Sequence, residues 1–226
     1  MRIALCLSGY VGFDDKIVGL DTGTFNDSNK ISIPEGYETI KKNVISDYDC
    51  DTFIHSWDVE QKKEILEIYK PKDYIIEPQK GADEGILDGS GYSQWYSRKK
   101  VIELALEAKQ NYDWIFVTRF DLIFEMKFIY ETYDKSCVYV PGEPRPVSIN
   151  DLYVMGSEEN MNHVKDLFDN LKSEGYDINN KNGGAAGGIH FTAGKYIRKK
   201  AGVKCLGTDA GPKKTIYNIR KWAEGR

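Results

Sequence analysis

Short apolar runs alternate with amphipathic segments along the first 120 residues, and this alternation limits the chain to few folds. The apolar runs are RIALCLS at 2–8, TFIHSW at 52–57, DYIIE at 73–77 and WIFV at 114–117. The intervening segments are helical patterns: one opens at Pro34, one covers VEQKKEILEIY, and one places Val101, Leu104 and Ala105 on a single face. Strand–helix–strand alternation predicts an α/β fold with a mostly parallel central sheet flanked by helices.

The second half of the chain is more irregular. CVYV and LYVMG are typical of strands, and Met161, Val164, Phe168 and Leu171 have the spacing of an amphipathic helix. The glycine-rich stretch NNKNGGAAGG follows, then a helical segment to about Lys200, a stop at Gly202 and a short strand at 203–206. Because neither an internal repeat nor a linker interrupts the 226 residues, we expect a single domain.

Composition bounds the class of protein. With 41% hydrophobic and 29% charged residues, the chain is typical of a soluble globular protein. The opening MRIALCLSG is too short for a secretory signal, and no apolar run reaches the roughly 18 residues of a membrane span. We therefore expect a cytoplasmic protein. The cysteines Cys6, Cys50, Cys137 and Cys205 lie far apart without CxxC spacing, which predicts reduced side chains and neither a zinc site nor a disulfide framework.

Opposite charges lie in the middle of the apolar stretch WIFVTRFDLIF. Arg119 and Asp121 follow the predicted strand directly, and ligands of open α/β sheets bind beyond the carboxyl ends of the strands. Two residues apart on an extended chain, the side chains point to the same side. They suit a phosphate with a bound divalent cation, since carboxylate oxygen binds metal and guanidinium binds phosphate. The alternative is that they pair with each other or cap the strand end.

Five sequence blocks together resemble a known family. MRIALCLSG, DTFIHSWD, SQWYSRKKVIELAL, YDWIFVTRFDLIF and NDLYVMGSEENM occur in this order over residues 1–172. They look like small glycosyltransferase-like proteins of the GT-A type, met in polysaccharide and lipopolysaccharide gene clusters and in viruses. The resemblance implies a single GT-A-like (Rossmann-like) domain, with a nucleotide-sugar-binding half at 1–125 and an acceptor-side half at 126–226. It implies transfer of a sugar from a nucleotide-sugar donor to a glycan or lipid-linked acceptor hydroxyl.

The resemblance also implies a metal site. GT-A enzymes hold Mn²⁺ or Mg²⁺ on the donor diphosphate with a DxD motif after a central strand, and the corresponding triplet here is Arg119-Phe120-Asp121. Only Asp121 matches, so it inherits the metal-ligand role, and His190 is the candidate second ligand. Arg119 departs from the motif, and a guanidinium can neutralise phosphate without an ion. A metal-free donor site is therefore an alternative.

Further donor-side residues follow from the same resemblance. Leu7, Ser8 and Gly9, at the end of the first strand, would offer backbone and hydroxyl groups to the base and ribose; Gly9 can equally be a turn glycine. Ser97 and Lys100 lie near the predicted start of the helix that leads into WIFV, where a helix N-terminus suits a diphosphate.

The remaining polar residues receive separate interpretations. Arg98 and Lys99 are expected to be solvated. At Asp151, just before the LYVMG strand, the resemblance implies a residue that faces the sugar or the acceptor, and Asp151 is therefore the candidate catalytic base for the acceptor hydroxyl. Without the resemblance, a turn or cap is the preferred interpretation. His55 lies within a strand pattern and is expected to be a hydrogen-bonded structural residue.

Residues 195–226 hold ten Lys/Arg and two acidic residues, a local charge of +8 in a chain whose net charge is −4. A solvated tail is one interpretation. The alternation with apolar residues in KKTIYNIRKW instead favours ordered structure that closes over the donor diphosphate or makes peripheral contact with an anionic membrane or lipid-linked acceptor. The acidic overall balance argues against nucleic acid as a partner.

Two other function classes remain open. A non-catalytic nucleotide-sugar or glycan binding protein of the same fold would explain the absence of the first DxD aspartate. LSGYVGFDD could also be a Rossmann-like cofactor loop of a methyltransferase or dehydrogenase, although GxxG alone is a weak signal.

Overall fold

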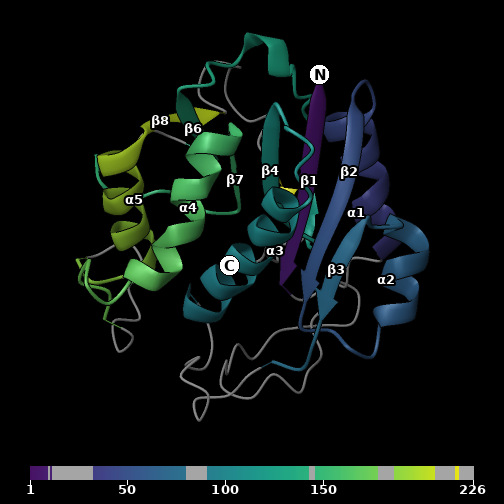
Figure 1. Ribbon diagram of the computed structural model, residues 1–226, viewed down its shortest axis with the longest axis horizontal. Coiled ribbons are helices and arrows are strands. Elements are labelled where there is room, and N and C mark those ends of the chain that lie inside the picture. Colours follow the sequence, from purple (N-terminus) through teal and green to yellow (C-terminus); the bar gives the residue numbers. More distant parts are fainter. Residues whose placement is uncertain are drawn as a thin grey trace, which may run out of the picture.

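The computed structural model describes residues 1–9, 11, 33–79, 91–142, 146–177, 186–206 and 217–218. Seven strands form one sheet (Figure 1); in order across it they are β3 (Asp73–Ile76), β2 (Asp49–Ser56), β1 (Arg2–Gly9), β4 (Trp114–Arg119), β7 (Tyr153–Gly156), β6 (Cys137–Pro141) and β8 (Gly202–Leu206). β7 runs antiparallel to both neighbours, whereas the other pairings in this sheet are parallel. The predicted α/β fold with a mostly parallel sheet is therefore confirmed.

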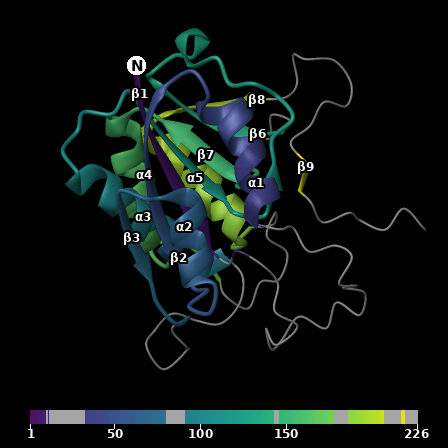
Figure 2. The same ribbon diagram turned by 90° about the vertical axis from the view of Figure 1, so that its right-hand side faces the viewer.

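Helices cover both faces of the sheet (Figures 1 and 2). One face carries α3 (Gly91–Glu107), α4 (Glu158–Asn170) and α5 (Ile189–Lys200); the other carries α1 (Ile33–Ile40), the π-helix η2 (Lys41–Ile45) and α2 (Lys62–Tyr69). A 3₁₀ turn, η4 (Tyr130–Thr132), and a two-stranded ribbon of β5 (Leu122–Ile123) with β9 (Tyr217–Asn218) lie outside the main sheet. On the second face, Phe124 and Phe128 of the segment after β4 also pack against Phe116 and Tyr153 of the sheet.

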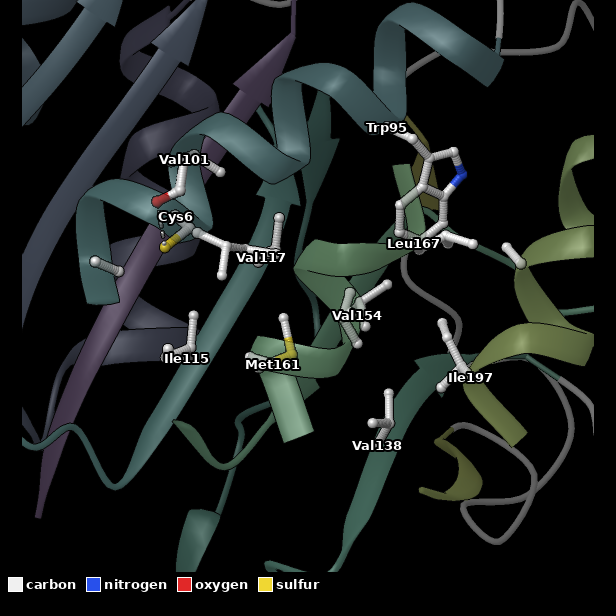
Figure 3. Packing of buried hydrophobic residues seen from close by; sticks show 14 of the residues in the cluster. Cys6, Trp95, Val101, Ile115, Val117, Val138, Val154, Met161, Leu167 and Ile197 are labelled. Atoms are coloured by element: carbon white, nitrogen blue, oxygen red, sulfur yellow. Dashed lines mark hydrogen bonds between the residues drawn. The ribbon is translucent and has the colours of Figure 1, made fainter. Parts of the chain in front are cut away.

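Successive side chains of the central strands point alternately into two hydrophobic clusters, one on each face of the sheet. On β1, Ala4 and Cys6 pack toward α3, whereas Ile3, Leu5 and Leu7 pack toward the opposite layer. Figure 3 shows the first cluster, in which Cys6 and Val117 lie beneath α3 and α4. A strand buried on both faces is apolar at every position, which is why IALCL and WIFV are continuous runs.

Local differences from the sequence expectations have simple causes. The helix predicted from Pro34 to near Asp47 changes from α to π geometry at Lys41. Gly202, predicted as a helix stop, is instead the first residue of β8, and Ala201 caps α5 in an extended conformation.

The basic C-terminal segment, predicted to be ordered, lies only partly within the described residues. The basic residues of α5 are described, but most of the tail from residue 207 onward, including most of KKTIYNIRKW, lies outside the described residues. Within the part of the chain that the structure describes, no helix combines the length and apolar character that a membrane crossing requires.

Candidate functional site

The strand order reverses between β1 and β4. The chain proceeds from β1 outward to β2 and β3, then returns to add β4 on the other side of β1. In open α/β sheets ligands bind outside the carboxyl ends of the strands at such a switch point. Ser8 and Arg119 are directly opposite each other in the β1–β4 register. The structure therefore brings the predicted donor residues of both strands together at this edge, the carboxyl edge.

The end of β1 offers mainly backbone. Gly9 has φ +100°, which favours glycine, and no heavy atom of the described residues lies within 4 Å of the position that a Cβ there would take. Ser8 is buried, and its hydroxyl donates a 3.3 Å hydrogen bond to the carbonyl of Thr118. The Leu7 side chain is fully buried in the opposite layer, so any contact of Leu7 with a ligand would come from its backbone.

Arg119 and Asp121 bind each other. Arg119 Nε donates to Asp121 Oδ1 at 2.7 Å, and Arg119 Nη2 donates to Asp121 Oδ2. The side chains are 23% and 10% exposed, so the guanidinium is the more accessible partner. This bidentate geometry corresponds to the alternative in which the two charges pair with each other.

The start of α3 differs from the prediction for Ser97 and Lys100. Because the helix already begins at Gly91, Ser97 lies in its second turn and Lys100 in its third, away from the unpaired backbone N–H groups of the first turn. Lys100 Nζ lies 3.0 Å from Glu103 on the same helix. The helix N-terminus argument for these two residues was therefore wrong.

Ser97 instead belongs to a buried hydrogen-bond chain. Its hydroxyl lies 2.7 Å from His55 Nδ1, and His55 Nε2 lies 3.3 Å from Glu77 Oε1. Burial lowers the pKa of His55 from 6.5 to about 4, although the nearby Glu77 carboxylate opposes that shift. The prediction that His55 is a hydrogen-bonded structural residue is confirmed. His55 is opposite Ser8 in the β1–β2 register, so it joins β2 to α3 at the carboxyl edge.

Arg98 is fully buried, so the prediction that it is solvated was wrong. Its Nη1 donates to Asp151 Oδ2 at 2.8 Å, its Nη2 donates to the Asp151 carbonyl, and its guanidinium lies 4.6 Å from the centre of the Trp95 ring. Arg98 follows Trp95 and precedes Val101 by three residues each, which puts it on the buried face of α3. That spacing was the signal in the sequence that could have identified it.

Asp151 connects this guanidinium to His190. His190 Nδ1, in the first turn of α5, lies 3.2 Å from Asp151 Oδ1. Burial alone would raise the pKa of Asp151, but the charge of Arg98 and the contact with His190 hold that pKa well below its usual range. Asp151 is therefore an ionised, enclosed carboxylate. Its predicted role as base remains a prediction, although a carboxylate in this state is a weak proton acceptor.

The guanidinium groups of Arg98 and Arg119 lie close enough to each other at the carboxyl edge to interact. Burial lowers the pKa of Arg98, Asp151 opposes this, and the charge of Arg119 adds to the lowering. Arg119 lies at the end of β4, and the preceding Thr118 is opposite Tyr153 of β7 in the register. Along the carboxyl edge from β1 toward β7, Ser8 and Arg119 come first. The Arg98–Asp151–His190 cluster follows.

The described residues do not form a ready cation site. Both oxygens of Asp121 accept hydrogen bonds from Arg119, and within the described ranges no group of three or more His, Cys, Asp or Glu side chains is arranged to hold a metal. His190 contacts Asp151, which was not one of its expected metal-binding partners. A Mn²⁺ or Mg²⁺ ion on Asp121 would share this carboxylate with Arg119, and metal binding by Asp121 and His190 remains a prediction.

Comparisons with protein-family models and with curated proteins found no match. The resemblance to GT-A glycosyltransferases therefore rests on the sequence blocks themselves.

Proposed function

We propose that this protein is a glycosyltransferase that moves a sugar from a nucleotide-sugar donor to a hydroxyl of a glycan or lipid-linked acceptor. The observation that carries the proposal is the register of Ser8 against Arg119 at the switch point between β1 and β4. The resemblance selected these residues from separate sequence blocks, and the fold independently brings them to the edge where ligands of α/β sheets bind.

Arg119 carries the central chemical role in this proposal. Transfer breaks the bond between the anomeric carbon and a diphosphate oxygen, forms a bond to the acceptor oxygen, and releases a nucleoside diphosphate and a proton. Negative charge builds on the departing diphosphate, and a planar guanidinium stabilises it with paired N–H donors. When the donor binds, Arg119 would exchange its carboxylate partner, Asp121, for phosphate oxygens of the donor.

A non-catalytic nucleotide-sugar binding protein is the second candidate. It is favoured by the pairing of Arg119 with both oxygens of Asp121, which occupies the carboxylate that corresponds to the metal ligand of GT-A enzymes. Such a protein would bind the donor without releasing nucleoside diphosphate.

The experiment is a thermal-shift screen of UDP-, GDP-, CMP- and dTDP-sugars, each with Mn²⁺, Mg²⁺ or EDTA, because a ligand that binds the folded state raises its melting temperature. We expect a shift with one nucleotide class that persists in EDTA. Release of nucleoside diphosphate (CMP for a CMP-sugar) from that donor would distinguish an enzyme from a binding protein. The absence of a shift with all four classes would contradict the proposal.

A further inference from the structure

Asp121 is held in place by the residues on both sides of it. Phe120 and Leu122 are 2% and 0% exposed, and both belong to the hydrophobic cluster that packs against α1 and α2. Leu122 also lies in β5, which pairs with β9. The backbone of Asp121 therefore cannot shift far without pulling a buried side chain out of the core.

The chain beyond β5 is bound to α1 and to the π-helix η2. Phe124 N donates a 3.3 Å hydrogen bond to Thr39 Oγ1, and Asn43 Nδ2 donates one of 2.5 Å to the Phe124 carbonyl. Phe128 N donates to the Asn43 carbonyl at 2.8 Å. Because this segment is fixed, we expect the Asp121 carboxylate to keep its position when a ligand reaches the carboxyl edge.

Arg119 is the partner whose side chain can move. Its backbone is fixed opposite Ser8, but its side chain is long and 23% exposed, whereas that of Asp121 is 10% exposed. In the part of the chain that the structure describes, Asp121 pairs with no other cation. Arg98, the other guanidinium at this edge, is fully buried and bound to Asp151. Asp121 would therefore lose its counter-charge if Arg119 turned away.

An anion that binds Arg119 is opposed by Asp121 in either of two arrangements. If the anion takes the Nε and Nη2 donors, Asp121 loses both hydrogen bonds and keeps an unpaired, mostly buried charge, which is unfavourable. If the anion binds the Nη1 donors instead, the carboxylate stays on the same guanidinium and repels the anion. In both arrangements the negative charge of Asp121 weakens anion binding.

We infer that Asp121 is an internal competitor for Arg119: its carboxylate holds the guanidinium in the ligand-free protein and weakens the binding of phosphate-containing ligands. The inference rests on the proposed function, which makes the diphosphate of a nucleotide-sugar the ligand of Arg119. It gives Asp121 a role opposite to that of a metal ligand, whose loss would weaken donor binding. A ligand that contacts Arg119 alone, such as inorganic pyrophosphate, would bind weakly for this reason.

The test is calorimetric titration of inorganic pyrophosphate, UDP, GDP, CMP and dTDP into the full-length chain, in EDTA so that no divalent ion contributes. We expect Asp121→Asn to bind pyrophosphate, and any nucleotide that the wild type binds, about tenfold more tightly than the wild type does. Asp49→Asn is the matched control, because it removes the same charge at the amino edge, where the Asp49 side chain is 72% exposed. It should leave these affinities unchanged.

Two further variants test whether the gain depends on Arg119. When Asp121→Asn is combined with Arg119→Gln, the gain should disappear, because the guanidinium for which Asp121 competes is absent. Asp121→Ser removes the same charge with another residue that is common in turns. It should reproduce the gain, and it replaces Asp121→Asn if that variant does not fold.

The outcomes separate the inference from the proposed function. Equal, weaker or undetectable pyrophosphate binding by Asp121→Asn overturns the inference, even where a nucleotide-sugar raises the melting temperature of the wild type. A gain of equal size in Asp49→Asn, or one that persists with Arg119→Gln, overturns it as well. A gain that depends on Arg119, together with no binding of any nucleotide-sugar, would support the competition and contradict the proposed function.

Discussion

The two edges of the parallel strands each hold an aspartate that gathers cations, but with different surroundings. At the amino edge, Asp51 Oδ2 accepts hydrogen bonds from Arg2 at 2.9 Å, Lys72 at 2.8 Å and Tyr112 at 2.6 Å. Its side chain is 19% exposed. Burial opposes ionisation, yet the hydrogen bonds from Lys72 and Tyr112 lower the pKa of Asp51 below its usual range. These contacts tie together the segments that enter four strands.

At the carboxyl edge the corresponding aspartate is more enclosed. Asp151 is 5% exposed and pairs with Arg98, which is fully buried, while a second guanidinium, Arg119, lies near enough to affect Arg98. A charge cluster by itself does not identify a ligand site, because both edges have one. The topology decides: the crevice of an open α/β sheet lies at the carboxyl edge, where the strand order reverses.

The largest difference between the edges should appear on deletion of each aspartate. Asp151→Ala leaves Arg98 as an uncompensated buried charge, and we expect it to lower the free energy of unfolding by about 3–5 kcal/mol. Asp51→Ala, at a partly solvated site, should cost about 1–2 kcal/mol. Urea denaturation measures both. Equal costs would show that the edges do not differ in this respect.

A second test concerns segment 147–151, which contains Asp151 and packs closely against α5. Gly194→Ala would place a methyl group against Val147 O and push segment 147–151 away from α5. We expect a loss of about 1–3 kcal/mol in unfolding free energy. Gly156→Ala is the control, since its nearest neighbours are side-chain atoms at 3.2 Å or more. A larger loss for Gly156→Ala than for Gly194→Ala would argue against the close approach.

The edges should also lose stability in different pH ranges. The pKa of His55 is lowered in the folded state, so the unfolded chain takes up a proton first as the pH falls. We therefore expect up to about 3 kcal/mol of stability to be lost between about pH 6.5 and pH 4. Asp51, whose pKa is also lowered, contributes stability that is lost only below about pH 4. In chemical denaturation measured at a series of pH values, His55→Asn should remove the loss of unfolding free energy between about pH 6.5 and pH 4. The loss below about pH 4 should be unchanged.

The smallest effect is expected for an exposed pair at the amino edge. Lys72 is 37% exposed, so Lys72→Met should change the free energy of unfolding by less than about 1 kcal/mol. The difference should shrink further in high salt, because exposed ion pairs are screened. Denaturation at low and high ionic strength measures this, and a salt-independent difference would indicate that packing of the Lys72 stem matters more than its charge.

The sequence predicted most of the fold because its signals are local. Apolar runs such as RIALCL and WIFV and the spacing of Val101 and Leu104 determine strands and helices directly. The π-helix at Lys41 was missed, since the apolar periodicity of an α-helix persists across it. The antiparallel direction of β7 also had no local signal, because strand direction depends on where the chain returns to the sheet.

The candidate site was less predictable because its contacts join distant segments. Arg119 and Asp121 were identified because they directly follow a predicted strand. Their spacing did not show whether they would pair with each other or bind a ligand. Arg98 and Asp151 are separated by 53 residues along the chain, and neither residue alone indicates the other. The buried spacing of Arg98 on α3 was the available clue, and the polar run SRKK concealed it.

Donor binding at the carboxyl edge is best tested by calorimetric titration of nucleotide-sugars into the wild-type chain, Arg119→Ala and Lys72→Met. The proposed function requires that one nucleotide-sugar binds the wild type in EDTA, that Arg119→Ala weakens this binding at least tenfold while it remains folded, and that Lys72→Met at the amino edge leaves it unchanged. Unchanged affinity in Arg119→Ala, or a loss of equal size in Lys72→Met, would contradict a donor site at Arg119.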